Sequence, residues 1–114
     1  RLQQVTLHCE NYTAFLNRLL ERDLTQMVIY CDPPYAPLSK TASFTGYAAN
    51  KFTLEDQQQL ATLAKQLAKK GAVVLISNHD TPFTRSIYKG AKLKKIEVSR
   101  TISCHGGTRS KVSE

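Results

Sequence analysis

The stretch Met27-Val-Ile-Tyr-Cys31, followed at once by Asp32-Pro-Pro-Tyr35, decides the fold of this 114-residue chain. A continuous apolar run of this length predicts a strand in the buried centre of a parallel sheet. Two prolines after a strand cannot donate backbone hydrogen bonds and restrict the residue before them, so they predict a rigid turn. We expect this proline turn (residues 32–35) to aim the Asp32 carboxylate and the Pro33 carbonyl at one point, with the Tyr35 ring beside it.

Upstream of the proline turn, the sequence predicts one strand and one helix. Residues 5–9 are rich in β-branched and apolar side chains, which is typical of a short strand. Asn11 then suits the N-cap position of a helix. The apolar residues of that helix recur at the spacing of a single face: Tyr12, Phe15, Leu16 and Leu19.

Downstream of the proline turn, the pattern continues as a loop, a helix and a strand. Residues 36–52 show no clear period, so we expect a long loop there. Thr53 and Asp56 resemble a capping box that starts a helix with an apolar stripe, and Gly71 suits the end of that helix. Residues 72–77 are a second apolar run and predict a second buried strand.

The last part of the chain predicts a short helix and a hairpin. Thr81 as N-cap and Pro82 at the first helical position open a helix that we expect to end near Gly90. Apolar and polar residues alternate over residues 96–102, which predicts a strand with one wet face. The pair Gly106-Gly107 is a hairpin turn signal, after which a return strand should begin.

This order of elements predicts an α/β fold, with a mainly parallel sheet and an antiparallel hairpin at its edge. In such sheets, ligands bind beyond the carboxyl ends of the strands. Asn11, Asp32 and Asn78 each follow a strand that should be parallel to the others. We therefore expect them to share one rim of the sheet, and we expect the functional site on that rim.

The charge of the chain favours a polyanionic partner such as nucleic acid. Lys and Arg number 16 against 9 Asp and Glu, which gives a net charge of +7. Between residues 85 and 111 there are eight basic residues and one acidic residue, Glu97. A nucleic-acid surface and an ordinary solvated basic face explain this run equally well.

Several classes of protein do not fit the sequence. No apolar run approaches the roughly 20 residues that cross a bilayer, and no secretory leader opens the chain. The three cysteines form no close pair, which argues against disulfides and favours a reducing cytoplasm. His8, Cys104 and His105 are not spaced like the ligands of a metal site, so no metal is predicted.

A planar base with an exocyclic amine fits the predicted proline turn. The amine can donate one hydrogen bond to the Asp32 carboxylate and one to the Pro33 carbonyl, while the base stacks on Tyr35. The amino group of adenine is a poor nucleophile because its lone pair is delocalised, and two acceptors favour a pyramidal nitrogen. They also stabilise the positive charge that develops as a methyl group arrives. The methyl donor must be strongly activated, as is the sulfonium methyl of S-adenosylmethionine.

Four stretches resemble the bacterial Dam-type DNA adenine methylases: residues 30–39, 52–55, 74–80 and 103–109. They occur in the family's order and cover nearly the whole chain. The resemblance implies a Rossmann-like fold and methylation of adenine N6 in double-stranded DNA, typically at GATC, with S-adenosylmethionine as cofactor and with the base flipped. It implies that Asp32, Pro33, Pro34 and Tyr35 form the catalytic pocket for the target adenine. Asp32 would also lie beside the methyl donor.

Further site residues follow from the same resemblance. Asn11 and Tyr12 fall where related enzymes place a pair that touches the adenine of the cofactor, although Asn11 is also explained as a helix cap. Phe44, Tyr47 and Asn50 lie in the long loop, which in the family sits near DNA. Simple packing within the loop explains these three equally well.

The end of the chain supplies the other candidates. Arg109 and Lys111 flank the predicted hairpin and are the expected phosphate contacts. Asn78-His79-Asp80 resembles a family segment behind the target pocket. We interpret it as a turn that also lines the pocket wall, since no nucleophile elbow accompanies it.

The sequence also departs from the family, because its glycine-rich cofactor loop and its specificity hairpin lie upstream of the region matched here. We therefore expect residues 1–114 to be the C-terminal portion of a methyltransferase catalytic domain, inactive alone, from a cytoplasmic, DNA-associated enzyme of a bacterium or phage. Two other functions stay open. One is an RNA amino-methyltransferase, and the other is a non-catalytic remnant that binds nucleic acid through its basic face.

Overall fold

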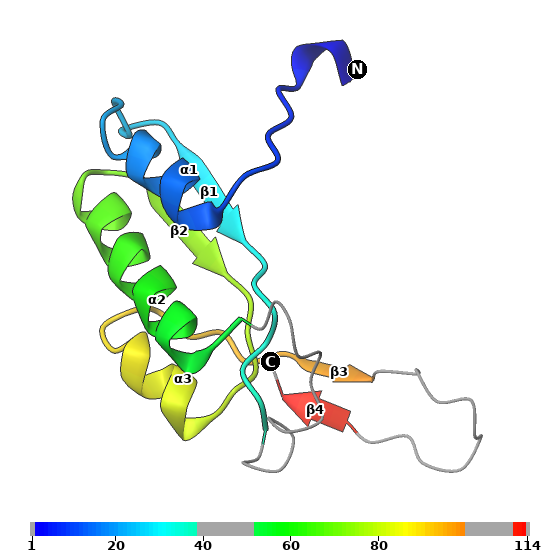
Figure 1. Cartoon of the computed structure of the whole chain (residues 1–114). Helices are drawn as coiled ribbons and strands as arrows, with labels where there is room; N and C mark the ends of the chain where they lie inside the picture. Colours follow the sequence, from blue (N-terminus) through cyan, green and yellow to red (C-terminus); the bar gives the residue numbers. More distant parts are fainter. Residues whose placement is uncertain (1, 39–51, 100–110, 114) are drawn as a thin grey trace.

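The computed structural model describes residues 2–38, 52–99 and 111–113. Within these residues, helices alternate with short strands, as Figure 1 shows. In chain order the elements are the 3₁₀ helix η1 (Leu2–Gln4), α1 (Tyr12–Leu19), β1 (Val28–Cys31), α2 (Leu54–Lys69), β2 (Val73–Ile76), α3 (Pro82–Ile87), β3 (Glu97–Ser99) and β4 (Lys111–Ser113).

Strands β1 and β2 pair in parallel, and helix α2 lies in the connection between them. Val28 lies opposite Val73 at one end of the pair, and Cys31 lies opposite Ile76 at the other. A parallel pair needs a long crossover of this kind, because its strands cannot be joined by a tight turn. The predicted α/β fold with parallel strands is therefore confirmed for this pair, and the residues after β1 and β2 leave the sheet at the same edge.

The helices cover one face of the β1–β2 pair (Figure 1). The core under them joins residues of α1, α2 and β1 with residues that precede β1 and β2: Leu16, Leu19, Leu24, Ile29, Leu60, Leu63, Leu67 and Ala72. Side chains on the other face of the strands are more than half exposed, at 64% for Val28 and 56% for Val73. The prediction that both strands are buried on both faces is therefore wrong for the described chain, because its helices lie on a single face.

Helix boundaries follow local chemistry. The Asn11 side chain accepts a hydrogen bond from the Thr13 N–H and caps α1. At the start of α2, Thr53 and Asp56 satisfy each other's backbone N–H groups in a capping box. At its end, Gly71 adopts a φ of 109°, a left-handed conformation that costs glycine little. These three helix signals, all predicted from the sequence, are confirmed.

The segment before α1 does not form the predicted strand. Residues 5–9 are irregular and follow η1, and the segment extends away from the rest of the chain in Figure 1. A strand needs a neighbour to receive its backbone hydrogen bonds, and no described strand lies beside these residues. Val5 and Leu7 are accordingly exposed, at 53% and 85%.

Helix α3 begins as predicted and ends earlier than predicted. Thr81 is its N-cap and Pro82 its first residue, but the helix ends at Ile87, and turns lead on to Gly90. Strands β3 and β4 then pair antiparallel, with Val98 opposite Val112. They form a two-stranded sheet separate from β1–β2, so the hairpin is not an edge of the parallel sheet. The predicted turn at residues 106–107 lies outside the described residues.

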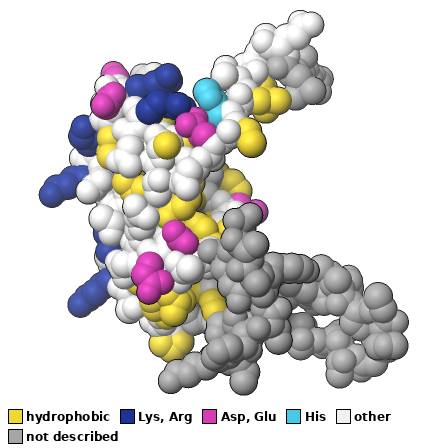
Figure 2. All heavy atoms as spheres, in the orientation of Figure 1, with side chains coloured by type: hydrophobic (Ala, Val, Ile, Leu, Met, Phe, Trp, Pro, Cys, Tyr) yellow, Lys and Arg dark blue, Asp and Glu magenta, His cyan; other side chains and the backbone are white. Residues whose placement is uncertain are grey.

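Basic side chains gather along the outer side of α1 and α2 on the face drawn in Figure 2. None of the helices among the described residues is long and apolar enough to span a membrane.

Candidate active site

Asp32 lies directly after β1, at the edge of the sheet where β1 and β2 both end. Its carboxylate oxygen Oδ1 accepts a hydrogen bond of 2.7 Å from the Ser77 hydroxyl, which directly follows β2. The Asp32 side chain is exposed, and the ion pairs formed by carboxylates among the described residues involve Glu10 and Asp80 instead. Asp32 is therefore held at the rim and is open to solvent.

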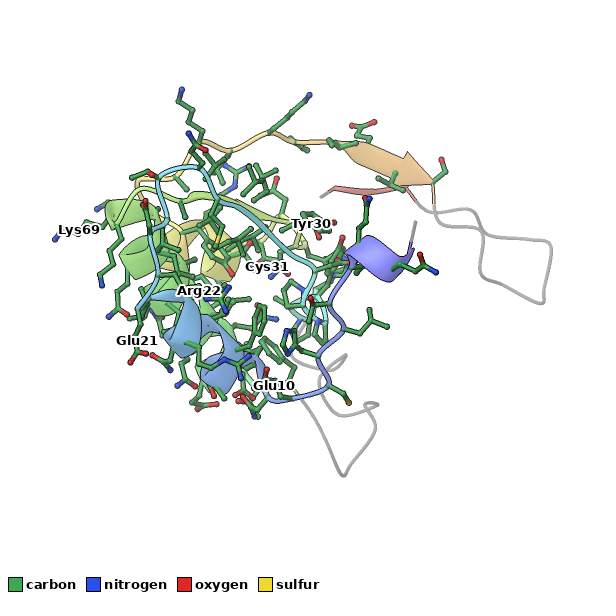
Figure 3. The ribbon with its side chains drawn as sticks, turned by 90° about the horizontal axis from the view of Figure 1, so that it is seen from above. Glu10, Glu21, Arg22, Tyr30, Cys31 and Lys69 are labelled. Carbon is green, nitrogen blue, oxygen red and sulfur yellow. The ribbon has the colours of Figure 1, made fainter. Side chains whose placement is uncertain are left out.

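The strand before Asp32 alternates its side chains between two faces. Figure 3 shows Cys31 on the side of the helices and Tyr30 on the opposite side. Cys31 packs against the core, and burial raises the pKa of its thiol. The Tyr30 hydroxyl lies 3.2 Å from Ser77 Oγ, so Tyr30, Ser77 and Asp32 form a chain of polar contacts on the open face.

The Tyr35 ring contacts the segment that follows β2. Its centroid lies 5.0 Å from that of the His79 ring, and the two rings meet edge to face at 80°. Nδ1 of His79 lies 2.7 Å from the backbone carbonyl oxygen of Ala36. The Tyr35 ring, which we expect beside Asp32, therefore packs against the His79 ring, and His79 is itself held by the Ala36 carbonyl.

Two side-chain amides, one buried and one half-buried, hold the backbone around Tyr35. The Gln57 side chain, only 1% exposed, donates to the Pro34 carbonyl at 2.7 Å and accepts from the Asn78 amide at 2.9 Å. Asn78 in turn accepts from the Ala36 N–H at 2.8 Å. These contacts bring Asn78 against the backbone after the proline turn, while its place in the wall of a target pocket stays a prediction.

Gln57 was not among the residues singled out in the sequence. A signal for it exists, because Gln57 stands three residues before Leu60 and four before Ala61 on α2. This spacing places a polar residue on the apolar stripe of the helix. Polar side chains buried in this way normally have a specific hydrogen-bond partner.

The candidate cofactor residues Asn11 and Tyr12 lie at the start of α1. Asn11 is exposed and caps the helix, and no strand precedes it to bring it to the rim with Asp32. The Tyr12 hydroxyl donates to the Asp56 backbone carbonyl at 3.2 Å, and its ring lies 5.4 Å from that of Phe52. The expectation that Asn11 shares the rim through a preceding strand is therefore wrong, while a role of either residue toward a cofactor stays a prediction.

The other predicted site residues are not placed. Phe44, Tyr47, Asn50 and Arg109 lie outside the described residues. Lys111 belongs to the described backbone of β4, but its side chain is not described. Within the described ranges, no three potential metal-ligating side chains come together.

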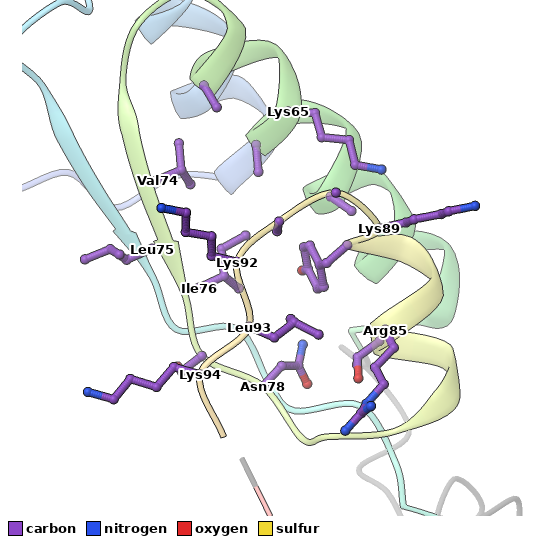
Figure 4. Close-up of a pocket in the computed structure, with 18 of the residues that line it drawn as sticks. Lys65, Val74, Leu75, Ile76, Asn78, Arg85, Lys89, Lys92, Leu93 and Lys94 are labelled. Carbon is purple, nitrogen blue, oxygen red and sulfur yellow. The ribbon is translucent and has the colours of Figure 1, made fainter. Parts of the chain in front are cut away.

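A groove of about 740 Å³ lies on the side of β2 that faces α2 and α3, next to the end of the sheet where Asp32 lies. Its walls come from α2, α3, β2 and residues 89–96, and it reaches the rim at Ser77 and Asn78 (Figure 4). Seven basic residues line it: Lys65, Lys69, Arg85, Lys89, Lys92, Lys94 and Lys95. Much of the basic run noted in the sequence therefore borders one groove next to the proline turn.

One of these basic residues is neutralised locally. Arg85 donates two hydrogen bonds to the Asp80 carboxylate, at 2.6 and 2.8 Å. The guanidinium donors lower the pKa of Asp80, and the carboxylate raises the pKa of Arg85. Asp80 is thus engaged with Arg85, and the lysines supply the remaining positive charge of the groove.

Comparison with known proteins gives the family. The model of the D12 class N6 adenine-specific DNA methyltransferases matches residues 1–102. The DNA adenine methylase of Vibrio cholerae serotype O1 is 50% identical over 115 residues, which cover 100% of this chain and 40% of that protein. The DNA adenine methylase of Escherichia coli K12 is 49% identical over 114 residues, with coverage of 100% and 40%.

A relative from Haemophilus influenzae, also a DNA adenine methylase, is 57% identical over 88 residues, which cover 76% of this chain and 31% of the relative. The chain thus spans 40% of the length of the curated relatives that it matches in full. The family match extends over the helices, the parallel strands and the proline turn between them. The chain belongs to the family of D12 class N6 adenine-specific DNA methyltransferases.

Proposed function

We propose that this chain supplies the target-adenine pocket of a site-specific DNA methyltransferase, which transfers a methyl group from S-adenosylmethionine to adenine N6. The observation that carries the proposal is the exposed Asp32 carboxylate at the tip of β1, held by Ser77 and followed by the two prolines and Tyr35. By its family resemblance the enzyme acts on double-stranded DNA at GATC. An adenine must leave the duplex to reach such a turn.

The chemistry follows from the groups on the proline turn. Asp32 accepts a hydrogen bond from one N–H of the adenine amine, and the Pro33 carbonyl accepts one from the other. Both acceptors would stabilise the positive charge that grows on the nitrogen as it takes the methyl group and the methyl carbon–sulfur bond breaks, because they are fixed before the reaction. The cofactor would leave as a neutral thioether, and the surplus proton on the nitrogen would pass to Asp32 or to water. The Tyr35 ring stacks on the base, and its face adds cation–π stabilisation.

The cofactor supplies an electrophilic methyl group attached to a positively charged sulfur. An exposed carboxylate at the carboxyl end of a strand suits a cationic ligand, and Asp32 meets both conditions. We propose that Asp32 lies beside the methyl donor as well as the target amine, with Asn11 and Tyr12 as candidate contacts to the cofactor. The part of the relatives' length that this chain does not span would supply further contacts.

The proposed polyanionic partner is duplex DNA. Six lysines border the groove beside the rim, and lysine ammonium groups close to phosphates release counterions and strengthen binding. Arg109 and Lys111 remain candidate phosphate contacts, and Phe44, Tyr47 and Asn50 remain candidate contacts to DNA. A DNA substrate places the enzyme where the DNA is, which in a bacterium is the cytoplasm.

Product analysis tests the proposal. The whole polypeptide that carries this chain is incubated with S-adenosylmethionine labelled in its methyl group and with either duplex DNA or RNA. The nucleosides are then separated by chromatography. The proposal predicts N6-methyladenine from DNA alone. Label recovered only from RNA supports an RNA amino-methyltransferase, and salt-sensitive DNA binding without any transfer supports a non-catalytic remnant.

A further inference from the structure

We propose that Gln57 and Asn78 form a positioning pair that fixes the proline turn in its reactive shape. The inference rests on the proposed methyl transfer and adds residues that act through the turn and do not touch the substrate. It comes from a closed series of hydrogen bonds that surrounds Tyr35.

The series begins and ends on the backbone around Tyr35. The Pro34 carbonyl accepts from Gln57 Nε2 at 2.7 Å, and Gln57 Oε1 accepts from Asn78 Nδ2 at 2.9 Å. Asn78 Oδ1 then accepts from the Ala36 N–H at 2.8 Å. The two amides are joined head to tail, and they bridge the residues on either side of Tyr35.

The polarity of the series requires side chains that both accept and donate hydrogen bonds. The Ala36 N–H can only donate and the Pro34 carbonyl can only accept, so each intervening group must accept on one side and donate on the other. An amide does this, whereas an ionised carboxylate has no donor. Asn78 also accepts from the His79 N–H at 2.9 Å, which fixes the orientation of its amide.

The pair acts on the Pro33 carbonyl through the backbone. Two torsions separate the carbonyls of Pro33 and Pro34, namely φ and ψ of Pro34. The pyrrolidine ring locks φ at about −65°, so only ψ is soft. Holding the Pro34 carbonyl against Gln57 therefore narrows the directions open to the Pro33 carbonyl, the acceptor used in the proposed reaction.

Burial makes the series rigid. Gln57 and Ala36 are each 1% exposed, so water does not readily replace their hydrogen bonds, and leaving any member unpaired is costly. Gln57 lies on the first turns of α2, and the Thr53–Asp56 capping box fixes the start of that helix. The turn is thus tied both to α2 and to the segment after β2.

Three variants of the whole polypeptide test the pair. Gln57→Met keeps the size and removes both hydrogen bonds, while Gln57→Glu keeps the acceptor and removes the donor when ionised. Gln58→Glu is the matched control, because Gln58 is exposed on the same helix. We expect both Gln57 variants to lower kcat about 10- to 100-fold, since small misplacements of reacting groups are costly. The KM of both Gln57 variants for DNA should stay within about two-fold of the wild-type KM. The kcat of the control Gln58→Glu should likewise stay within about two-fold of the wild-type kcat.

The pH profile separates positioning from loss of fold. In Gln57→Glu, protonation of the new carboxyl restores a donor toward Pro34, and burial raises the pKa of a carboxyl. The kcat of Gln57→Glu relative to wild type should therefore rise as pH falls from about 8 to about 6, while that of Gln57→Met should not change. His79 and Asp32 are present in every variant, so the ratio to wild type removes any pH dependence that the proteins share. Tyr88, with its pKa of about 12, does not titrate in this window.

A second readout does not depend on activity. Hydrogen exchange of the Ala36 amide should be faster in both Gln57 variants at neutral pH and unchanged in Gln58→Glu. The inference would be overturned if Gln57→Met kept the wild-type kcat and the wild-type exchange rate at Ala36. It would also be overturned if the Gln57 variants lost thermal stability but kept kcat and Ala36 exchange unchanged. If the wild type transfers no methyl group, the proposed function fails, and Ala36 exchange alone then decides whether the pair holds the turn.

Discussion

At the scale of single residues, the position of Asp32 and Tyr35 just after a strand could be predicted, because the constraint on them is local. The prolines between them follow a strand directly, and the structure places Asp32 exposed at the strand end with its carboxylate on Ser77. Gln57 is different, because its partners Pro34 and Asn78 are 23 and 21 residues away. No local sequence pattern predicts such a pairing. The one indication is that Gln57, a polar residue, lies on the apolar stripe of α2.

Replacing Tyr35 tests the stacking plate. Tyr35→Ala removes the ring, and base–aromatic stacking is worth about 1–3 kcal/mol, so kcat/KM should fall about 10- to 100-fold. Tyr35→Phe keeps the ring and should retain most of the activity. Methyl transfer to duplex DNA, together with the fluorescence of 2-aminopurine at the target position, measures the effect. Equal activity of Tyr35→Ala and wild type would exclude a stacking role.

At the scale of elements, the helix ends were predictable and the first strand was not. Caps such as Asn11 and the Thr53–Asp56 box satisfy backbone groups with side chains only two or three residues away. A strand instead depends on a neighbour, and residues 5–9 have none among the described strands. Strands β3 and β4 meet this need by pairing with each other, in a sheet separate from β1 and β2.

The residue at the end of helix α3, Tyr88, carries a buried hydroxyl whose effect on stability can be tested. The Tyr88 hydroxyl is buried beside Asn78, yet it makes no hydrogen bond that meets normal distance and angle limits. Burial, chiefly, raises the pKa of Tyr88 to about 12. Because the ordinary value is about 10, the unfolded state loses this proton first, and the protein should lose stability as pH rises from about 10 to about 12.

Tyr88→Phe removes both the unpaired hydroxyl and its titration. We expect its free energy of unfolding at pH 7 to equal or exceed that of wild type, because no buried polar group is left unsatisfied. Its stability should fall less than that of wild type between about pH 10 and about pH 12. Urea unfolding at several pH values measures both effects. A less stable variant at pH 7 would show that the hydroxyl has a partner in solution.

At the scale of the whole molecule, the sequence predicted the parallel α/β arrangement but not the open face. Tyr30 and Leu75 are more than half exposed on that face, at 65% and 53%. Apolar strands such as β1 and β2 read as buried on both sides, yet the described helices cover only one. The chain spans 40% of the length of the relatives that match it from end to end. No local sequence pattern shows which other segments pack on the open face of the β1–β2 sheet.

The isolated chain is therefore expected to behave differently from the whole polypeptide. Residues 1–114 alone should show no robust methyl transfer to duplex DNA, and they should bind more of the apolar dye ANS because of the exposed sheet face. Labelled methyl transfer and dye fluorescence, measured at equal molar concentration for both proteins, check this. Robust turnover by the isolated chain would refute the expectation that it is an inactive fragment.

The central claim is that the Asp32 carboxylate, held at the tip of β1, activates the amine of an extruded adenine. The most direct test is single-turnover methyl transfer by Asp32→Ala in the whole polypeptide, with the Kd for duplex DNA measured in parallel and the exposed Glu21→Ala as control. The claim predicts that Asp32→Ala loses about 100-fold or more in rate, while its Kd stays within a few-fold of wild type. Near-normal transfer by Asp32→Ala would contradict it.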